Sequence, residues 1–396
     1  MRLPSFIRKR VPRFLREWKH PHLKTSPVLG LGDDGTKQKR ALVSYITMPF
    51  RLRPGHPDHI RFSNNGIARN IVRALNELGY MVDVVEWSDT KFTPKRKYDL
   101  FLGHGGTNFV SLAGQLPADI AKIYFSSGTY WKHFNDAEEA RFAALVQRRG
   151  VRLAYDRWIH ESEENANRTA DGIICLGNEV ARETYASFPV VRNVNNAAYA
   201  EPRNELAKKN FGAARRNFLF FSGGGNVHKG LDLLLEAFSR VNAHLWICQH
   251  IVPEFWALYR KELEEQPNIH TVGTVPMRSP EYYALADRCA YVIHPSCAEG
   301  CVGSVVECMH QGLVPVVSRE STVETGDYGI TLKNCSIEEI ARTVEELSQK
   351  PAEWCAEKSR ATRAAAEQNF SEVAFLKNIR GAFESALRRP GGDGKD

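Results

Sequence analysis

The stretch from residue 290 to residue 318 constrains the fold of this chain more than any other. It reads AYVIHPSCAEGCVGSVVECMHQGLVPVVS. Residues 291–294 form a short apolar run with a β-branched pair, which is typical of a buried parallel strand. A helix is predicted to begin near Val302 and to end at Gly312, before a second buried strand over residues 314–317. The order strand, loop, helix, strand therefore predicts part of a parallel α/β sheet.

Two glutamates in this stretch, Glu299 and Glu307, predict a ligand site. Glu299 lies in the loop after the first strand, and Glu307 lies one to two turns into the helix. Gly303 precedes Glu307 on the same helix face and has no side chain, so a ligand has room beside the carboxylate. Free backbone N–H groups from Glu299 through Gly300 to Ser304 favour an anion, and a nearby carboxylate suits sugar or ribose hydroxyls. In the alternative interpretation, Glu307 is a surface helix residue and Glu299 is an ordinary loop charge.

A second candidate segment, SGGGNVHKG, covers residues 222–230 at a predicted strand-to-helix turn. Gly223 and Gly224 can present amide hydrogens to a phosphate without Cβ clashes. Lys229 is predicted in the first helical turn, where the helix dipole disfavours a cation unless an anion offsets it. The segment therefore predicts a phosphate site, with an exposed lysine beside a glycine turn as the alternative.

Both segments resemble motifs of retaining GT-B glycosyltransferases, especially family 4. Glu299 and Glu307 resemble the EX7E signature, and Lys229 followed by Gly230 resembles the KG motif. The resemblance implies that Glu307 holds the nucleotide ribose, that Glu299 lies beside the donor sugar and that Lys229 binds the donor diphosphate. It also implies retention of anomeric configuration without a metal or a stable covalent intermediate.

The chain departs from this family at Gly224, where an arginine usually stands five residues before the lysine. One cation for the diphosphate is then missing, and charge would have to come from elsewhere, for example from His228. In the first half of the chain, His104 follows a predicted strand and resembles a family histidine near the cleft. It is a candidate for positioning an acceptor or assisting proton movement, or else a turn histidine bonded to backbone. Asn65 and Gly66, at a predicted helix start, are candidates for the leaving phosphate or the acceptor.

Strands alternate with helices twice along the chain, which predicts two doubly wound units. The fold class expected from the pattern and the resemblance is α/β, GT-B, with two Rossmann-like domains facing a cleft. The predicted divisions are a basic arm and linker (1–40), an acceptor domain (41–205), a donor domain (206–368), a helix returning to the first domain (369–388) and a disordered tail (389–396).

Charge and cysteine placement narrow the class of protein. Of the net charge of +7, residues 1–19 carry +6, so general nucleic-acid binding is not expected. This arm is amphipathic and resembles an interfacial helix for an anionic membrane, with a disordered or self-packed arm as the alternative. No apolar run spans a bilayer and no secretory signal is evident, so cytoplasmic residence is expected, on the inner membrane face if the arm binds lipid. The eight cysteines form no CxxC pair and no Asp-x-Asp occurs, so buried reduced thiols and no metal or other cofactor are expected.

The predicted function is a retaining glycosyltransferase that moves a sugar from a nucleotide sugar to a glycan or lipid-linked acceptor, in cell-surface polysaccharide or glycoconjugate synthesis. Two alternatives remain open. One is a GT-B relative such as a sugar-nucleotide epimerase or phosphorylase. The other is a catalytically silent GT-B binding module, which the missing arginine at Gly224 favours.

Overall fold

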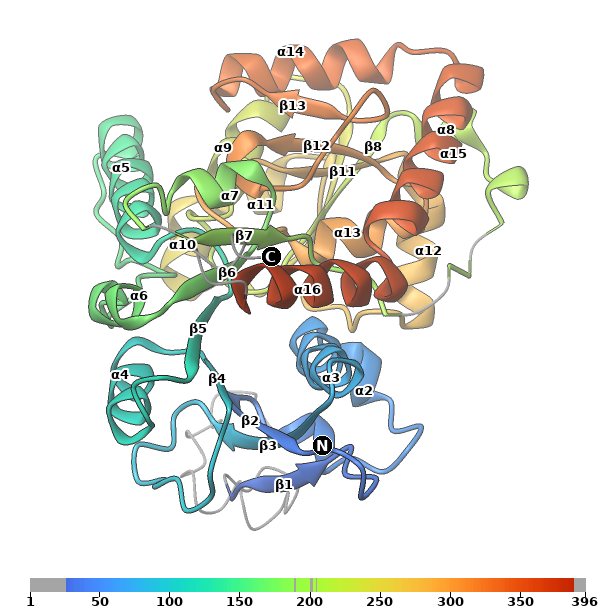
Figure 1. Ribbon diagram of the computed structural model, residues 1–396. Coiled ribbons are helices and arrows are strands. Elements are labelled where there is room, and N and C mark those ends of the chain that lie inside the picture. Colours follow the sequence, from blue (N-terminus) through green and yellow to red (C-terminus); the bar gives the residue numbers. More distant parts are fainter. Residues whose placement is uncertain (1–25, 189, 200–201, 204, 388–396) are drawn as a thin grey trace, which may run out of the picture.

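The computed structural model describes residues 26–188, 190–199, 202–203 and 205–387 as two α/β domains (Figure 1). The basic arm (1–19) and the tail (389–396), about which the sequence makes predictions, lie outside the described residues. In the rest of the chain the predicted alternation of strands and helices is confirmed.

The first domain is built on a seven-stranded sheet with the order β1-β3-β2-β4-β5-β6-β7. Every neighbouring pair is parallel except β1 and β3, which are antiparallel. The strands are β1 (Val28–Leu31), β2 (Lys39–Tyr45), β3 (Tyr80–Glu86), β4 (Leu100–Gly103), β5 (Ala121–Ser126), β6 (Gly172–Leu176) and β7 (Val191–Val194). The helices are η2 (Met48–Phe50), α2 (Asp58–Arg61), α3 (Ser63–Glu77), α4 (Gly106–Gln115), α5 (Trp131–Arg149), α6 (Glu164–Thr169) and α7 (Glu179–Glu183).

The second domain is built on a six-stranded, fully parallel sheet with the order β10-β9-β8-β11-β12-β13. The strands are β8 (Asn217–Phe221), β9 (His244–Cys248), β10 (Ile269–Thr271), β11 (Tyr291–His294), β12 (Val314–Ser318) and β13 (Ile330–Leu332). The helices of this half of the chain are η3 (Leu206–Lys208), α8 (Phe211–Ala214), α9 (Leu231–Phe238), α10 (Pro253–Leu258), α11 (Arg260–Glu265), α12 (Pro280–Arg288), α13 (Gly303–His310), η4 (Arg319–Ser321), α14 (Ile337–Ser348), α15 (Ala352–Asn369) and, after the second domain, α16 (Glu372–Leu387).

Residues 28–31 form an edge strand, which corrects the prediction that residues up to 40 are an arm and linker. The short segment VLGL has no polar alternation that would indicate a strand. A tertiary contact fixes it: Asp83 of β3, which is fully buried, accepts a hydrogen bond of 2.7 Å from the backbone N–H of Gly30. The same carboxylate also accepts from Arg40 at 3.2 Å and from the Tyr98 hydroxyl at 2.9 Å.

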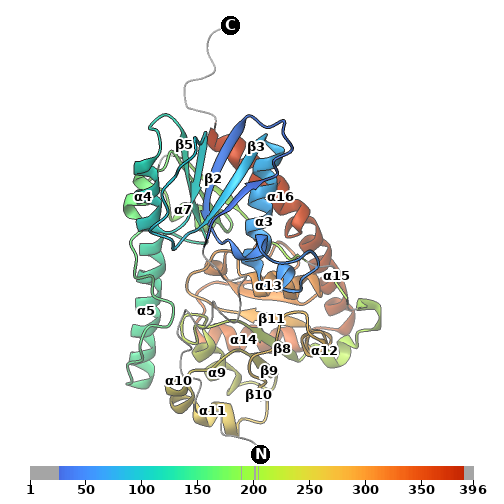
Figure 2. The ribbon, with the colours of Figure 1, turned by 90° about the horizontal axis from the view of Figure 1, so that it is seen from below.

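Helix α5 follows a first-domain strand but packs on the core of the second domain. Its residues Phe142 and Leu145 belong to the apolar cluster that contains Phe218 and Leu234. Beyond this core, its last turn carries Arg148 and Arg149, which pair with carboxylates of α9 and α11. Figure 2 shows α5 running alongside both domains. The helix therefore joins the two domains, although its sequence position alone assigns it to the first.

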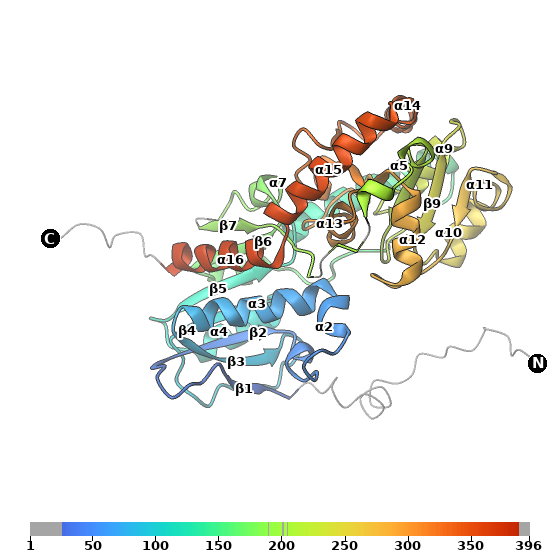
Figure 3. The same cartoon turned by 90° about the vertical axis from the view of Figure 1, so that its right-hand side faces the viewer.

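Helix α16 returns from the second domain to the first, as the sequence predicts. Its buried residues Phe375, Ile379, Ala382 and Phe383 share one apolar cluster with strands of the first sheet and with α3. Figure 3 shows α16 lying along α3. Within the described residues, no helix is both long and apolar enough to cross a membrane.

Candidate functional site

A cavity of ≈ 560 Å³ lies between the two domains, at the carboxyl ends of strands from both sheets. Open α/β sheets bind ligands at this edge, because the loops there are free to shape a site. The first half of the chain lines it with Phe62, Ser63, Asn64, Ser127, Arg157, Leu176 and Asn196. The second half lines it with Phe221, Ser222, Gly223, Lys229, Cys248, residues 274–277 and residues 299–304.

Most of the residues predicted for donor binding converge on this cavity. Gly223 and Lys229 reach it from the loop after β8, and Glu299, Gly300, Gly303 and Ser304 reach it from the segment that opens α13. Residues 274–277, in the loop after β10, line it as well. Gly224, Glu307, His104, Asn65 and Gly66 are not among its lining residues.

Lys229 and Glu299 form a buried ion pair at the cavity wall. The Lys229 ammonium donates to Glu299 Oε1, and only 9% and 10% of the two side chains are exposed. Burial opposes ionisation of Glu299. Lys229, His228 and His294 outweigh the effect of burial and lower the pKa of Glu299 to about 2. The sequence predicts Lys229 in the first helical turn, but the structure places it in the turn before α9. The helix-dipole argument therefore does not apply to Lys229. Its charge is offset by Glu299 instead.

His228 does not supply the positive charge that the sequence leaves open. Its ring is fully buried, is stacked on Phe134 and is 2.7 Å from the Ala298 carbonyl through Nε2. Burial lowers the pKa of His228 to about 4, although the nearby Glu299 acts in the opposite direction. The imidazole is therefore neutral at pH 7.

Glu307 is buried inside the second domain, with 3% of the residue exposed. This excludes the alternative that it is a surface helix residue. Its Oε1 accepts a hydrogen bond from the guanidinium of Arg278. Arg278 has a backbone φ of 63°. Burial raises the pKa of Glu307 to about 7, which Arg278 partly counteracts. Glu307 lies one turn beyond the cavity residues Gly303 and Ser304, with its carboxylate engaged by arginine.

The glycines of the α13 loop serve close contact between the domains. A Cβ at Gly300 would lie 2.1 Å from the Ser127 carbonyl oxygen and 2.4 Å from Gly128 Cα. A Cβ at Gly303 would lie 2.9 Å from Ser63 Oγ. Ser63 of the first domain therefore borders the space that the sequence predicts for a ligand beside Gly303, and both residues line the cavity.

The three first-domain candidates have partners within the protein. His104 Nδ1 is 2.9 Å from the Phe125 carbonyl, and burial lowers the pKa of His104. Asn65 donates to the Asp58 carbonyl at 2.6 Å, and Gly66 lies against the Tyr199 ring. The backbone-bonded alternative for His104 is therefore the one that its contacts support. Ser63 and Asn64, immediately before Asn65, line the cavity in its place.

Several cavity residues were not predicted from the sequence. Ser63 and Asn64 open the helix already singled out, so a helix start assigned one or two residues earlier would have included them. Arg157 belongs to a segment without regular structure, and Ser127 and Asn196 follow short buried strands. No local pattern marks these three, because they reach the cavity through tertiary packing.

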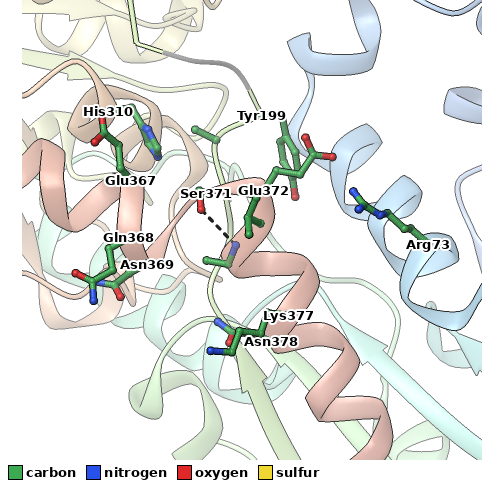
Figure 4. A pocket seen from close by; sticks show the side chains of 13 residues that line it. Arg73, Tyr199, His310, Glu367, Gln368, Asn369, Ser371, Glu372, Lys377 and Asn378 are labelled. Atoms are coloured by element: carbon green, nitrogen blue, oxygen red, sulfur yellow. Dashed lines mark hydrogen bonds between the residues drawn. The ribbon is translucent and has the colours of Figure 1, made fainter. Parts of the chain in front are cut away.

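A larger cavity of ≈ 910 Å³ lies where α15 ends and α16 begins, facing α3 (Figure 4). None of the predicted site residues lines it. Its wall mixes the cations Arg73 and Lys377 with the carboxylates Glu367 and Glu372. This balance does not indicate one class of ligand.

All eight cysteines are buried and unpaired, as predicted. Among the described residues, no group of three or more His, Cys, Asp or Glu side chains is arranged to hold a metal ion.

Residues 215–350 match the family model described as "Glycosyl transferases group 1". No match was found among curated protein sequences. Solved structures similar to the chain include Anabaena HepE in complex with UDP and glucose, with 14% identity, a TM-score of 0.55 and coverage of 88% of this chain and 99% of that one.

Two further similar structures are a sucrose-phosphate synthase and an outer core galactosyltransferase. The synthase, from Thermosynechococcus elongatus, has 13% identity and a TM-score of 0.58, with coverage of 88% and 98% of the two chains. The lipopolysaccharide outer core galactosyltransferase WaaB has 12% identity and a TM-score of 0.54, with coverage of 88% and 100%. At these identities the likeness concerns the fold, and it confirms the predicted two-domain architecture.

Proposed function

We propose that this chain, which has the GT-B fold and carries a glycosyl transferases group 1 domain at residues 215–350, transfers a hexosyl group from a nucleoside-diphosphate sugar to an acceptor hydroxyl. The observation that carries the proposal is the convergence of Lys229, Glu299 and the start of α13 on one cavity between the domains. A cation and free helix N–H groups suit a diphosphate, and a carboxylate beside them suits sugar hydroxyls. The structures of HepE were obtained with UDP and glucose and with UDP-glucose, which supports the same class of donor for this chain.

The reaction breaks the bond between the anomeric carbon and the diphosphate oxygen and forms a bond from that carbon to the acceptor oxygen. Negative charge develops on the departing diphosphate, which also takes the acceptor proton. Lys229 and the free N–H groups of Gly303 and Ser304 stabilise this charge, with no metal required. We expect attack on the same face that the diphosphate leaves, with retention of anomeric configuration, because Glu299 and Glu307 resemble the EX7E signature of retaining enzymes.

The ion pair at the cavity wall gives Glu299 and Lys229 linked tasks. A bound diphosphate competes with Glu299 for the Lys229 ammonium. The released carboxylate can then accept hydrogen bonds from the hydroxyl groups of the donor sugar. We propose that Glu307 holds the ribose diol, which requires its carboxylate to turn from Arg278 towards the ligand.

The acceptor side is proposed to be a glycan or lipid-linked hydroxyl of a cell-surface polysaccharide or glycoconjugate. The basic, amphipathic residues 1–19 suit an anionic membrane surface, where such acceptors are made. Liposome flotation tests this proposal: deletion of residues 1–19 is expected to abolish binding to anionic vesicles. Unchanged flotation of the shortened protein would contradict the proposal that residues 1–19 bind an anionic membrane.

A second candidate function is a silent GT-B module that binds a glycan or nucleotide without turnover. The specific observation in its favour is internal neutralisation, since Lys229 pairs with Glu299 and Arg278 pairs with Glu307 without any ligand. Such ion pairs would stabilise the empty site of a module without turnover, and they would equally stabilise the empty site of an active enzyme.

Turnover assays separate these functions. The protein is incubated with UDP-, GDP- and ADP-sugars, with and without glycan acceptors, and nucleoside diphosphate release is measured. Acceptor-stimulated release supports a transferase, and isomerisation of free donor without acceptor identifies an epimerase. Phosphate-dependent formation of a sugar phosphate identifies a phosphorylase. Absence of all three reactions, with nucleotide binding retained, supports the silent module.

A further inference from the structure

Two cationic side chains line the interdomain cavity, and they differ in how their charge is used. Lys229 is buried and paired with Glu299. Arg157 is exposed, and among the described residues no carboxylate forms an ion pair with its guanidinium. A diphosphate carries more than one negative charge, so a lysine already offset by a glutamate leaves it under-neutralised. Arg157 is the cation at this wall whose charge is available.

The backbone of Arg157 is held in place by α5. The N–H groups of Asp156 and Arg157 donate to Glu138 Oε1 at 3.0 and 2.7 Å. Glu138 is fully buried, so these hydrogen bonds are shielded from water. Two residues further on, Asn135 and Ile159 exchange hydrogen bonds of 2.9 Å in both directions. The segment that carries Arg157 is therefore fixed to a helix and does not hang free.

The same segment is docked on the glycine-rich turn of the second domain. Asp156 Oδ2 accepts a hydrogen bond of 3.0 Å from the backbone N–H of Val227. The methylene stem of Arg157 crosses Gly225, where a Cβ would lie 2.8 Å from Arg157 Cγ and 3.0 Å from Cδ. Gly225 also has a φ of +98°, so both its backbone and this contact require glycine. The guanidinium is thereby carried across the turn that precedes Lys229.

The neighbouring Gly224 is under no such constraint. A Cβ placed there would meet no atom within 4 Å, and its φ lies outside the left-handed region. An arginine at position 224 would therefore fit, although none is present. The turn has room for a cationic side chain at position 224, but the cation that lies beside it is Arg157, from another segment.

We propose that Arg157 supplies the second positive charge for the donor diphosphate, reaching across from the segment after α5 to act beside Lys229. The inference rests on the proposed donor site and adds to it a residue from the first half of the chain. It follows that the donor site is complete only when this segment is held on α5 by Glu138 and docked on the second domain through Asp156.

Isothermal titration calorimetry with inorganic pyrophosphate and with UDP, GDP and ADP tests the assignment. Arg157→Ala is expected to weaken pyrophosphate and the preferred nucleoside diphosphate by ~10-fold or more, the usual scale of a charge-assisted contact. Arg157→Lys is expected to keep part of the affinity. The matched control is Arg152→Ala, an exposed arginine of the same segment that does not line the cavity.

A second-site variant makes the test independent of folding defects. Gly224→Arg, combined with Arg157→Ala, is expected to restore affinity, because the new guanidinium starts from the open position beside the same turn. Arg157→Ala binding as tightly as the unmodified protein, or Arg152→Ala losing as much, would overturn the inference and leave the donor site standing. Failure of the unmodified protein to bind pyrophosphate or any nucleoside diphosphate would instead overturn the proposed function and the inference with it.

Discussion

At the scale of single residues, the cavity wall depends on a charge pair that is almost removed from water. Lys229 and Glu299 keep 9% and 10% of their side chains exposed. Removing one member of such a pair leaves the other as an uncompensated buried charge, and this costs far more than the pair contributes. The two residues therefore serve stability as well as ligand binding, and the effects have to be separated by experiment.

The change Lys229→Met is expected to destabilise the protein by ~3 kcal/mol, because Glu299 then stays buried without a cation. The pKa of Glu299, about 2 in the folded protein, lies below the ordinary value of 4.5, so its stabilising contribution is present above pH 4.5 and is lost as the pH falls towards 2. In the variant this contribution disappears. Urea unfolding from pH 3 to pH 7 measures both effects.

The matched control is the double variant Lys229→Met/Glu299→Gln, which removes both charges and is expected to recover part of the lost stability. If the double variant is as unstable as the sum of its single changes, the two side chains are not coupled.

His294, at the end of β11, is the second residue whose charge state should show in stability. It is fully buried and stacked on Phe220, and neither ring nitrogen has a hydrogen bond to another described residue. Burial lowers its pKa to about 3, and the nearby Lys229 and His228 act in the same direction while Glu299 opposes them. Since the folded state resists protonation, stability is full above pH 6.5 and falls as the pH drops towards 3.

We therefore expect His294→Phe to flatten the pH dependence of unfolding between pH 6.5 and pH 4, with a difference on the order of 2 kcal/mol. Urea midpoints at several pH values measure it. The exposed His160, changed to Phe, is the control and should leave the slope as it is. An unchanged slope in His294→Phe would mean that this ring is not held neutral.

At the scale of elements, α5 is the part of the structure that sequence pattern describes least well. This helix spans Trp131–Arg149 and follows a strand of the first domain in the sequence. The sequence pattern could not show on which of the two domain cores this helix packs. An apolar face indicates burial but does not say which of two cores buries it. The ion pairs of Arg148 and Arg149 with Asp232, Glu236 and Glu262 decide this, and they join residues far apart in the sequence.

Because Leu145 is fully buried in the second-domain core, Leu145→Ala is expected to cost ~2–5 kcal/mol through lost contacts and a residual cavity. The adjacent Val146, 37% exposed on the same helix, is the control, and Val146→Ala should cost under ~1 kcal/mol. Hydrogen exchange locates the effect. Protection should fall in α9 and α14 of the second domain, and a loss confined to the first domain would contradict this assignment of α5.

At the scale of the whole molecule, the chain passes from the first domain to the second and then returns, because α16 packs on the first domain. The sequence was sufficient for this feature, because the family resemblance implied that the last helix returns to the first domain, and the buried Phe375, Ile379 and Phe383 confirm that return. It was also sufficient for both sheets and for the position of Gly303 and Ser304 at the cavity wall. It was not sufficient for Arg157, for the burial of Glu307 against Arg278 or for the edge strand β1. Each of these depends on long-range contacts that leave no local periodicity in the sequence.

Phe383 lies in α16, near the C-terminal end of the described chain, yet it is fully buried in the first-domain cluster. The change Phe383→Ala is expected to cost ~3–5 kcal/mol and to lower protection from hydrogen exchange in α3. Val373, on the same helix but 79% exposed, is the control, and Val373→Ala should be close to neutral. Loss of protection only in the second domain would show that α16 does not stabilise the first.

The central claim is that the interdomain cavity binds a nucleoside-diphosphate sugar, and thermal-shift binding tests it most directly. The unmodified protein, Lys229→Ala and Glu307→Ala are measured against a panel of nucleotides and nucleotide sugars. Because a ligand that binds only the folded state raises the midpoint by mass action, one nucleotide family should shift the unmodified protein while both variants lose the shift. No shift with any nucleotide, or an equal shift in both variants, would contradict the account.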